Sequence, residues 1–570
     1  NHYFEMNPPS NQTAKVALLS AVAIGIAAAI YTKKKNGGVN KLPSSKATSD
    51  KQSSGNSSSR LPGTSPSLKS NESTLTGASY IHRNESNTKN LDTIAEKEIA
   101  EVPEGYVLTD KVAIREVHLA EVAHLGAAFP SAGVENKMRF DRTDDERNIE
   151  YNQLLEDDDV ILYSVVRKGC KKTSTKAFLR AGPRPTNHFE PKTVKAAIVT
   201  CGGLCPGLNN VIREITLALR NLYGCTEVYG IRGGYNGFFD STLQPIELTP
   251  EVVDNIHLKG GTILGSARGG FDLEKILQFL EQTGVNQLYV CGGDGTHRGA
   301  HKIATECLRR NLNVAVAGVP KTIDNDIGLI DRSFGFQTAV EAAQAAIQAA
   351  KVEAQCNIPR GIGIVKLMGR SSGFIASHAA LASADVDLCL VPEVPLVPDG
   401  PQGFLPHLRR RVMEKGHAVV VLAEGAGEDV LGQSAEVDAG GNRKLPAVGD
   451  WVKKQIETYF SGQGMPATVK YIDPSYMIRS VPANSTDSLY CTLLSQNAVH
   501  GAMAGYTAFS VGLVNNRMVW IPMPILTDNS PRVMAPHGRT WERVLSATHQ
   551  PNTVPPDAKI DKMVTTRTVM

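Results

Sequence analysis

Aromatic residues are scarce in this chain of 570 residues: Phe, Trp and Tyr together make up 6%, whereas glycine occurs 51 times. That balance argues against an all-β binding module and favours an α/β enzyme with many backbone-lined turns. Hydrophobic residues account for 41%, an ordinary share for a soluble protein, so a large core is possible. The length exceeds what one compact domain usually needs.

Cysteine pairs with metal-binding spacing are missing. The nine cysteines are odd in number and scattered, and neither a CxxC pair nor a His/Cys cluster with zinc spacing occurs. Cys201 and Cys205 lie in one glycine-rich turn, where they are either a redox pair or reduced thiols that pack as small apolar groups. The second interpretation is favoured, and a reducing compartment fits it better.

A strong charge excess of either sign is also missing, because the formal net charge is only +3. Residues 1–90 contain 11 Lys and Arg against 4 Asp and Glu, and the remainder contains 49 against 53. The body of the chain is therefore mildly acidic. It lacks the electrostatic footprint of nucleic-acid binding, so we predict no nucleic-acid partner.

The apolar segment at residues 16–31 is slightly short for a membrane span, which needs about 20 residues. Lysines flank it on both sides, which is typical of a signal, a targeting segment or a short anchor. We therefore predict contact with a membrane or an import machinery through residues 15–35. If the segment spans, the basic run after it keeps the catalytic body in the cytosol.

From Lys195 onward, short apolar runs alternate with amphipathic stretches. The apolar runs occupy residues 196–200, 287–291, 314–319, 361–367, 388–394 and 418–425. Helical patterns between them include residues 337–351 and 371–382. Buried strands separated by helices predict an α/β fold with parallel sheets covered by helices on both faces. Ligands in such folds bind at the carboxyl ends of strands, so we expect the chemistry directly after each run.

Two glycine-rich turns follow predicted strands. CGGLCPGLNN at residues 201–210 lets the backbone approach a ligand at Gly203, and the helix after it presents free N–H groups to a phosphate. GGDGT at residues 292–296 places Asp294 between glycines, which suits an Mg²⁺–phosphate complex. A purely structural turn explains the first equally well, and a helix-capping aspartate is the alternative for the second.

Two further turns carry charged residues. PKTIDND at residues 320–326 spaces Asp324 and Asp326 so that both can face one ligand, one as proton acceptor and the other near a metal. A solvated acidic turn is the weaker alternative. MGRSSG at residues 368–373 presents Arg370, whose planar donors suit phosphate oxygens. The four turns together supply N–H groups, carboxylates and cations, which are the groups that enzymes of phosphoryl transfer use to position phosphates and stabilise their charge.

Taken together, these motifs resemble those of the phosphofructokinases. GGLCPGLNNVIRE, GSARGG, GGDGT, PKTIDNDI, MGRSSGF and PEVP occur in that family's order and approximate spacing over residues 190–530. GGDGT alone is shared with NAD kinases and diacylglycerol kinases. The chain is most similar to the long plant-type and protist-type ATP-dependent enzymes, which are related to the diphosphate-dependent branch. The resemblance implies two Rossmann-like parallel-sheet subdomains with the active site in the cleft between them.

The reaction implied by the resemblance is phosphorylation of the 1-hydroxyl of fructose 6-phosphate in glycolysis, with ATP and Mg²⁺. Asp324 would be the general base, and Thr322 and Asp326 would assist at the transferring phosphoryl group and its metal. Asp294 would hold Mg²⁺, and Arg370 would steady the developing charge on the γ-phosphate.

The binding residues that the resemblance implies fall into two groups. Those at the nucleotide would be Gly203, Tyr235, Arg268, Gly293, Gly295 and Thr296. Those at the sugar phosphate would be Arg360, Met368, Gly369, Glu424, Lys470, Tyr476 and Arg479. Arg360 would come from a neighbouring subunit. Lys470 stands where bacterial members often have Arg, so bidentate phosphate binding is not expected there.

Two residues give opposing indications of the phosphoryl donor. Gly295 leaves room for the α-phosphate of a nucleotide, whereas diphosphate-using relatives usually have Asp there. Lys321 stands where bacterial ATP enzymes usually have Gly and diphosphate enzymes have Lys. We give Gly295 more weight, because it directly admits or excludes ATP. A diphosphate-dependent enzyme and a catalytically inactive regulatory subunit are the alternatives.

The expected organisation of the chain has four regions. They are a basic, disordered N-terminal region at 1–90, an extension packed on the body at 91–190, the catalytic domain at 191–530 and a C-terminal tail at 531–570. The resemblance also implies an allosteric homo-oligomer, with a homotetramer favoured. The predicted location is the cytoplasm, and a plastid or a membrane-tethered form is the alternative.

Overall fold

The computed structural model describes residues 108–109, 112–113, 116–136, 154–165, 174–432, 436 and 444–556. The N-terminal region at residues 1–90, with its apolar segment at residues 16–31, lies outside these ranges, so the expectations for it stay predictions. None of the helices in the described ranges combines the length and the apolar character that crossing a membrane would need.

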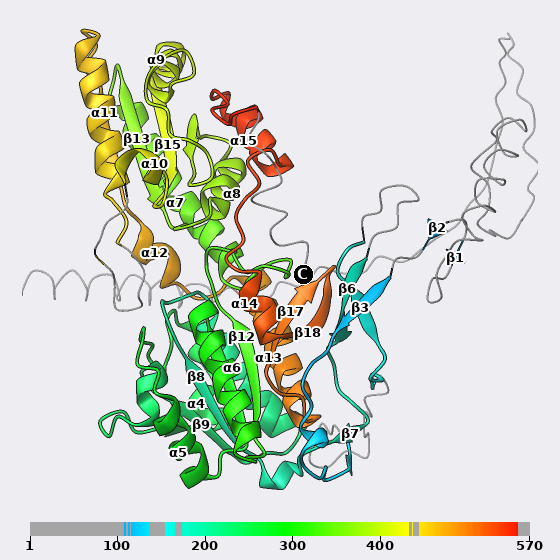
Figure 1. The fold of residues 1–570 in the computed structure, drawn as a ribbon. Coiled ribbons are helices and arrows are strands. Elements are labelled where there is room, and N and C mark those ends of the chain that lie inside the picture. Colours follow the sequence, from blue (N-terminus) through cyan, green and yellow to red (C-terminus); the bar gives the residue numbers. More distant parts are fainter. Residues whose placement is uncertain are drawn as a thin grey trace, which may run out of the picture. The chain divides into compact units, whose positions relative to one another are not determined.

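Most strands belong to two sheets (Figure 1). The larger sheet has ten strands in the order β10-β9-β8-β11-β12-β17-β18-β6-β3, and β5 also pairs with β6. Its strands are β3 (Val117–Ala120), β5 (Val160–Leu162), β6 (Thr175–Arg180), β8 (Lys195–Thr200), β9 (Glu227–Ile231), β10 (Ile246–Glu247), β11 (Gln287–Gly292), β12 (Ala315–Pro320), β17 (Phe509–Val514) and β18 (Arg517–Pro522). The central strands from β9 to β17 are parallel, as the sequence predicts.

Toward its edges this sheet contains antiparallel pairs, which the sequence did not predict: β10 with β9, β17 with β18, and β18 with β6. The last strand, β3, is again parallel to its neighbour β6. β17 and β18 form a hairpin through Asn515 and Asn516, both with positive φ (48° and 60°). Asparagine tolerates this conformation, and two such residues make a tight hairpin turn. β18 then pairs with β6, where Trp520 lies opposite Leu179. Strands from the region at residues 91–190 therefore extend the main sheet.

The smaller sheet has four parallel strands in the order β14-β15-β13-β16. They are β13 (Gly361–Leu367), β14 (Leu388–Leu390), β15 (His417–Ala423) and β16 (Thr468–Ile472). The apolar run at residues 361–367 is confirmed as a strand, and the run at 418–425 is confirmed as far as Ala423. The run at 388–394 is wrong beyond Leu390, because Pro392 has no N–H for a sheet ladder.

Helices cover both sheets (Figure 1). Those in the described residues are α3 (Leu208–Leu217), α4 (Pro250–Val253), α5 (Leu273–Thr283), α6 (Asp294–Arg309), α7 (Phe336–Cys356), α8 (Phe374–Ser383), α9 (Phe404–Lys415), α10 (Glu428–Leu431), α11 (Val448–Gly462), α12 (Ser475–Arg479), α13 (Ser485–Met503), α14 (Met523–Asp528) and α15 (Arg539–Thr548). The predicted helices at 337–351 and 371–382 correspond to α7 and α8. The region at 531–570 contains α15, which buries Trp541 and Val544 and contacts α8 and β14.

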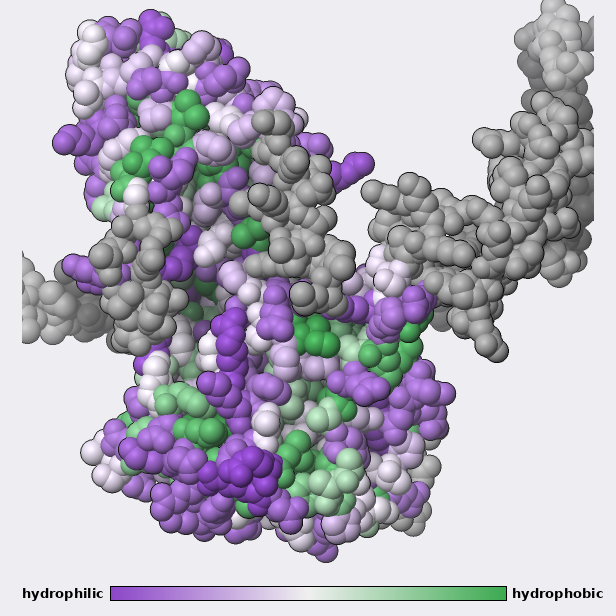
Figure 2. Space-filling model, viewed as in Figure 1, coloured by the Kyte–Doolittle hydropathy of each residue, from purple (hydrophilic) through white to green (hydrophobic). Residues whose placement is uncertain are grey.

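The central parallel strands of the larger sheet, β8, β11 and β12, are buried on both faces. Along β8, Ala196 and Ile198 belong to one apolar cluster, whereas Ala197 and Val199 belong to another on the opposite face. The first cluster continues through α7 to Val365 of β13, so one apolar core joins the two sheets. On the face drawn in Figure 2, hydrophilic residues cover most of the described surface, and apolar residues form separate patches.

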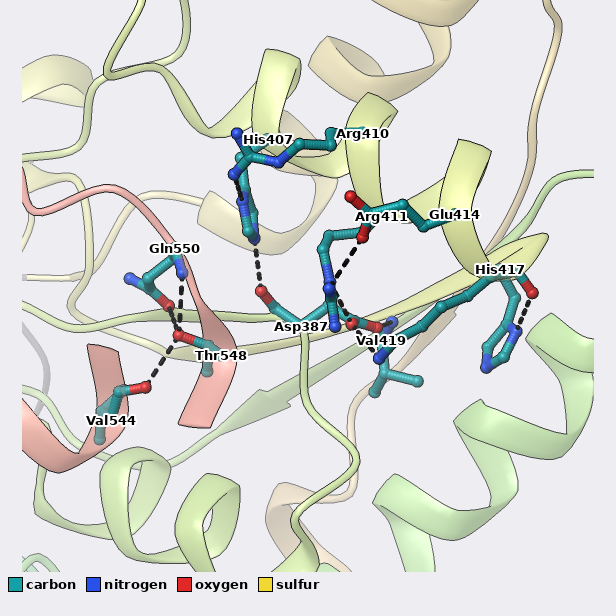
Figure 3. A network of polar contacts seen from close by, with 11 residues as sticks. Asp387, His407, Arg410, Arg411, Glu414, His417, Val419, Val544, Thr548 and Gln550 are labelled. Carbon is teal, nitrogen blue, oxygen red and sulfur yellow. Dashed lines mark hydrogen bonds and ion pairs between the residues drawn. The ribbon is translucent and has the colours of Figure 1, made fainter. Parts of the chain in front are cut away.

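A buried carboxylate organises one side of the smaller sheet (Figure 3). Asp387 is 1% exposed, and its Oδ1 atom accepts hydrogen bonds from Arg411 at 3.0 Å and Lys415 at 2.8 Å. Its Oδ2 atom accepts from the backbone N–H of Val419 at 3.0 Å. His407 completes the network by a contact of 2.7 Å from Nε2 to the Asp387 carbonyl oxygen. The charge is thus compensated, which is the condition for burying a carboxylate.

We expect Asp387→Ala to lower the free energy of unfolding by about 1–3 kcal/mol, because the buried N–H of Val419 loses its acceptor. Glu414→Ala is the matched control. Glu414 also pairs with Arg411, at 2.9 Å, but it is 50% exposed, so its loss should cost about 0–1 kcal/mol. Urea unfolding of both variants measures the difference, and equal losses would contradict this account of the network.

Candidate active site

The turn after β8 lies among three cations. Lys321 donates from Nζ to the carbonyl oxygen of Gly203 at 2.7 Å. A Cβ built on Gly203 would lie 3.7 Å from a guanidinium nitrogen of Arg268 and 3.9 Å from one of Arg479. The structure therefore brings together residues that the sequence assigned separately to the nucleotide and the sugar phosphate. Guanidinium and ammonium groups around bare backbone suit phosphate oxygens.

The GGDGT turn ends β11, and α6 begins within it at Asp294. The Asp294 carboxylate lies in the first turn of α6, where the helix dipole favours a negative charge. Gly295 faces open space, because a Cβ built on it meets no atom within 4 Å. The turn adjoins the PKTIDND turn, since the backbone N–H of Lys321 donates to the Gly292 carbonyl at 2.9 Å. A phosphate chain can approach the backbone on the side of Gly295.

Tyr235 lies behind this turn rather than in the open. It belongs to the 3₁₀ helix η4 (Gly234–Phe238), is 4% exposed, and donates from its hydroxyl to the carbonyl oxygen of Thr296 at 2.8 Å. Its ring packs edge-on against Phe271, with centroids 5.2 Å apart. Burial raises the pKa of its hydroxyl well above the usual value. Tyr235 holds the turn in place, and its contact with a nucleotide stays a prediction.

The turn after β12 carries the two aspartates. Asn325 lies between them in a left-handed conformation (φ 57°), and its side-chain oxygen accepts from the backbone N–H of Ser333 at 2.9 Å. Asparagine is among the few residues that adopt this conformation readily. Burial raises the pKa of Asp326, and a hydrogen bond from the Thr322 hydroxyl opposes the rise. The local sequence thus fixes the two carboxylates beside each other.

Asp324 has the electrostatics of a proton acceptor. The residue is half-buried, but its Oδ1 atom is enclosed and has no hydrogen-bond partner among the described residues. Loss of water contact raises its pKa above the usual range, and the charges of Asp326 and Glu424 raise it further. The backbone N–H of Arg370 and the charge of Lys321 act in the opposite direction. A raised pKa brings a carboxylate closer to the pH at which a general base works.

The turns of the smaller sheet contact this aspartate turn. Ser372 donates from Oγ to the carbonyl oxygen of Asp324 at 3.4 Å. The N–H of Gly425 donates to the carbonyl oxygen of Gly369 at 3.2 Å. A Cβ on Gly425 would lie 1.9 Å from the Arg370 carbonyl oxygen, so these backbones pack too closely for a side chain. The predicted residues Gly369 and Arg370 therefore lie where both sheets end.

Glu424 follows β15 and lines a cavity of about 280 Å³. Burial raises the pKa of its carboxyl group, against the charges of Lys366 and Arg370. Lys366, in the same cavity wall, pairs with Asp473 at 2.6 Å. Met368 is partly buried against the apolar core at the entry to its turn. The other polar residues that line the cavity are Asp450, Tyr471 and Asp473, and residues 445–449 form its apolar side.

Arg360 and Lys470 lie apart from this group. Arg360 precedes β13 and donates to the carbonyl oxygen of Pro466 at 3.1 Å, whereas Met368 follows the same strand at its other end. Lys470 is exposed on β16, opposite Gly363 near the start of β13. The seven residues of β13 separate Arg360 from Met368 by about 23 Å at 3.3 Å each. Gly363, the partner of Lys470, is five residues from Met368, which is about 17 Å. Both separations exceed the length of a side chain, so within one chain these two cations do not reach the turn at Met368.

Tyr476 and Arg479 lie on α12. The Arg479 guanidinium sits 4.9 Å from the centroid of the Tyr476 ring, which is itself exposed. Arg479 is the member of the pair that approaches Gly203. The structure therefore places Arg479 with Lys321 and Arg268 around Gly203, and it leaves Tyr476 exposed.

Three residues near the aspartate turn were missed by the sequence analysis. Asn325 lies within the PKTIDND motif, and its tolerance of left-handed backbone was the available signal. Glu393 lies in PEVP, and its carboxylate accepts from the N–H of Gly373 at 2.9 and 3.0 Å. Arg532 donates to the carbonyl oxygen of Asn325 at 3.0 Å from 207 positions away, and no local pattern marks it.

Comparison with known proteins identifies the family. The sequence model named Phosphofructokinase matches residues 195–502. The chain is 53% identical over 382 residues to ATP-dependent 6-phosphofructokinase 7 of Arabidopsis thaliana, covering 66% of this chain and 78% of that protein. The chain belongs to the phosphofructokinase family.

A second relative and a solved structure agree with this membership. ATP-dependent 6-phosphofructokinase 4, chloroplastic, of Arabidopsis thaliana is 51% identical, covering 68% of this chain and 73% of its own length. The crystal structure of the pyrophosphate-dependent phosphofructokinase of Nitrosospira multiformis has a TM-score of 0.52 and 18% identity, covering 65% of this chain and 96% of that one. At this identity the likeness shows the fold alone, and it confirms the predicted α/β architecture with two sheet-based subdomains.

Proposed function

We propose that this phosphofructokinase transfers the γ-phosphoryl group of ATP to the 1-hydroxyl of fructose 6-phosphate, giving fructose 1,6-bisphosphate in glycolysis. The observation that carries the proposal is the Asp324 carboxylate. It lies where the turns of both sheets meet, and its enclosed Oδ1 atom has no partner among the described residues. The names of the related proteins support ATP as donor.

The proposed chemistry assigns a separate task to each turn. The oxygen of the sugar 1-hydroxyl attacks the γ-phosphorus of ATP, and Asp324 accepts the proton of that hydroxyl. The bond from the γ-phosphorus to the β–γ bridging oxygen breaks, and this oxygen stays on ADP. Arg370 stabilises the charge that develops on the transferring group. Lys321 and Arg268, with the backbone at Gly203, hold the remaining phosphate oxygens in line.

The residues present fit Mg²⁺ bound together with the nucleotide. Within the described ranges, no group of three or more His, Cys, Asp or Glu side chains is arranged to hold a metal ion. Mg²⁺ usually takes one or two carboxylates and completes its coordination with water and phosphate oxygens. Asp294, at the start of α6 between two glycines, would supply such a carboxylate. The bound ion would neutralise charge on the phosphate oxygens.

A second copy of the chain would complete the sugar-phosphate site. Arg360 and Lys470 lie near the start of β13, away from Arg479 and Glu424, which supports their entering a neighbouring subunit's site. We therefore propose an allosteric homo-oligomer, with a homotetramer favoured. A monomeric mass in solution under assay conditions would contradict this arrangement.

The proposed location is the cytoplasm, with a plastid or a membrane-tethered form as the alternative. One relative carries a chloroplast designation in its name, which supports the plastid alternative. Residues 15–35 are the proposed contact with a membrane or an import machinery. Fractionation of cells that express the full chain with a C-terminal tag tests this, and the tag in a mitochondrial fraction would contradict all three locations.

The donor is tested with the purified chain, fructose 6-phosphate and Mg²⁺, with either ATP or diphosphate added. We expect fructose 1,6-bisphosphate with ATP, measured by a coupled assay with aldolase. Product with diphosphate alone would overturn the choice of donor. No product with either donor, from a folded chain, would favour the inactive regulatory subunit.

A further inference from the structure

A segment outside the recognised motifs packs directly on the aspartate turn. Residues 529–534 leave α14 and run toward α15, seen as the red chain between those labels in Figure 1. Gly328 has no room for a side chain, because a Cβ there would lie 1.9 Å from the Asn529 carbonyl oxygen. The N–H of Gly328 donates to Oγ of Ser530 at 3.0 Å. The segment and the turn are thus in backbone contact.

Arg532 makes the largest number of these contacts. Its guanidinium donates to the carbonyl oxygen of Asn325 at 3.0 Å and to that of Ile330 at 3.2 Å. Its backbone N–H donates to the carbonyl oxygen of Asp326. The guanidinium also lies 4.9 Å from the centroid of the Phe374 ring, at the start of α8. One side chain therefore binds Asn325, which lies between the two aspartates, and Ile330, which lies four residues after Asp326.

The same segment is fixed to the smaller sheet by a buried carboxylate. Glu393 is 9% exposed and accepts from the backbone N–H of Met534 at 2.8 Å. Both of its oxygens also accept from the N–H of Gly373, at the end of the turn that carries Arg370. Arg532 therefore contacts the turn that carries Asp324, and Met534 shares the Glu393 carboxylate with the turn that carries Arg370, so the segment is bonded to both turns.

We propose that residues 529–534 act as a positioning strap for the reaction, with Arg532 as its principal positioning residue. The aspartate turn comes from the larger sheet and the arginine turn from the smaller one, and Ser372 to Asp324 is a long contact of 3.4 Å. A displacement of about 1 Å at a reacting group can lower a rate about 10²-fold. The inference rests on the proposed kinase function, because the strap aligns the groups assigned to that reaction.

The test compares Arg532→Met, Arg532→Lys and wild type, with Arg543→Met as the matched control. Arg543 lies in the same C-terminal region but is exposed on α15. We expect Arg532→Met to lower kcat about 10-fold or more, with the KM values for ATP and fructose 6-phosphate changed less than about 3-fold, because substrates still bind while the reacting groups are misaligned. Arg532→Lys should recover part of kcat, and Arg543→Met should match wild type.

Amide hydrogen exchange gives a readout that does not depend on turnover. Peptides covering residues 324–330 should exchange faster in Arg532→Met than in wild type, and peptides from α5 should not change. Normal kcat together with normal exchange in this turn would overturn the proposal, and so would a general loss of stability with kcat unchanged. If Arg532→Met does not fold, Arg532→Lys and Glu393→Gln carry the same comparison.

The outcomes separate this proposal from the proposed function. If wild type makes no product from ATP, the kinase assignment fails, whereas the exchange comparison still reports whether Arg532 holds the turn. If wild type is active and Arg532→Met is equally active with unchanged exchange, the strap fails and the kinase assignment stands.

Discussion

Asp324→Asn is expected to lower kcat by about 10²–10⁴-fold, which is the usual contribution of a positioned general base. The amide has nearly the same shape as the carboxyl group but cannot accept the proton of the sugar hydroxyl. The KM for ATP should change little, because the proposed partner of the Asp324 carboxylate is the sugar hydroxyl and not the nucleotide. Steady-state kinetics of the variant measure both values, and near-normal turnover would remove the base assignment.

The same substitution is expected to raise the stability of the ligand-free chain at neutral pH. Burial and the charges of Asp326 and Glu424 raise the pKa of Asp324 above its unfolded value, so the folded state favours the protonated form. The stability from this group is complete below the unfolded pKa and is lost as the pH rises through the folded pKa. Asn mimics the protonated form and escapes that loss.

Thermal unfolding in metal-free buffer tests this trade-off between stability and activity. The Tm of Asp324→Asn should exceed that of wild type at about pH 8, and the difference should shrink toward about pH 3, where Asp324 is protonated in both the folded and the unfolded state. Asp399→Asn is the control, since Asp399 is an exposed aspartate far along the chain. If the Tm of Asp324→Asn is below that of wild type at pH 8, the folded chain does not disfavour the ionised form of Asp324, and the argument is contradicted.

The sequence predicted the parts of the fold that depend on local apolar runs. β8, β11 and β13 are continuous buried strands, and their composition alone indicates burial on both faces. The antiparallel pairing of β17 with β18 was not predicted, because an apolar run does not indicate the direction of its neighbour. The signal for this pair is the Asn515–Asn516 turn, whose two residues adopt positive φ. Turn chemistry, rather than periodicity, decides the direction of that strand pair.

The site residues could be predicted from the sequence where a reactive side chain lies in a turn that follows a predicted strand. Asp324 and Asp294 each follow a buried strand directly, so the rule about carboxyl ends of parallel strands suffices for them. Contacts between distant segments were not predictable in this way. The approach of Arg268 and Arg479 to Gly203, and the contact of Arg532 with Asn325, depend on how the two sheets pack together. The domain boundaries and the individual residue roles stay predictions.

Gly295→Asp is expected to raise the KM for ATP by about 10²-fold or more. A unit negative charge about 4 Å from a phosphate charge costs about 4 kcal/mol at an effective dielectric constant of about 20, and each 1.4 kcal/mol is a factor of ten. The fold should tolerate the change, because a Cβ on Gly295 meets no atom within 4 Å and an acidic residue is favoured in the first turn of α6. The Tm of the variant should therefore match wild type, and unchanged kinetics with ATP would refute the argument.

Two companion variants separate bulk from charge at this position. Gly295→Ala adds only the Cβ, so it should leave the KM for ATP near the wild-type value. Gly295→Asn has the size of Asp without its charge, so a KM as high as that of Gly295→Asp would assign the effect to bulk, and a smaller rise would assign it to charge repulsion. Diphosphate has no α-phosphate to pass Gly295, so any turnover with that donor should be less affected than turnover with ATP. Lys321, beside Gly203, can neutralise the phosphates of ATP or of diphosphate, so it does not distinguish the two donors. Gly295 does distinguish them, because only ATP has to pass it with an α-phosphate.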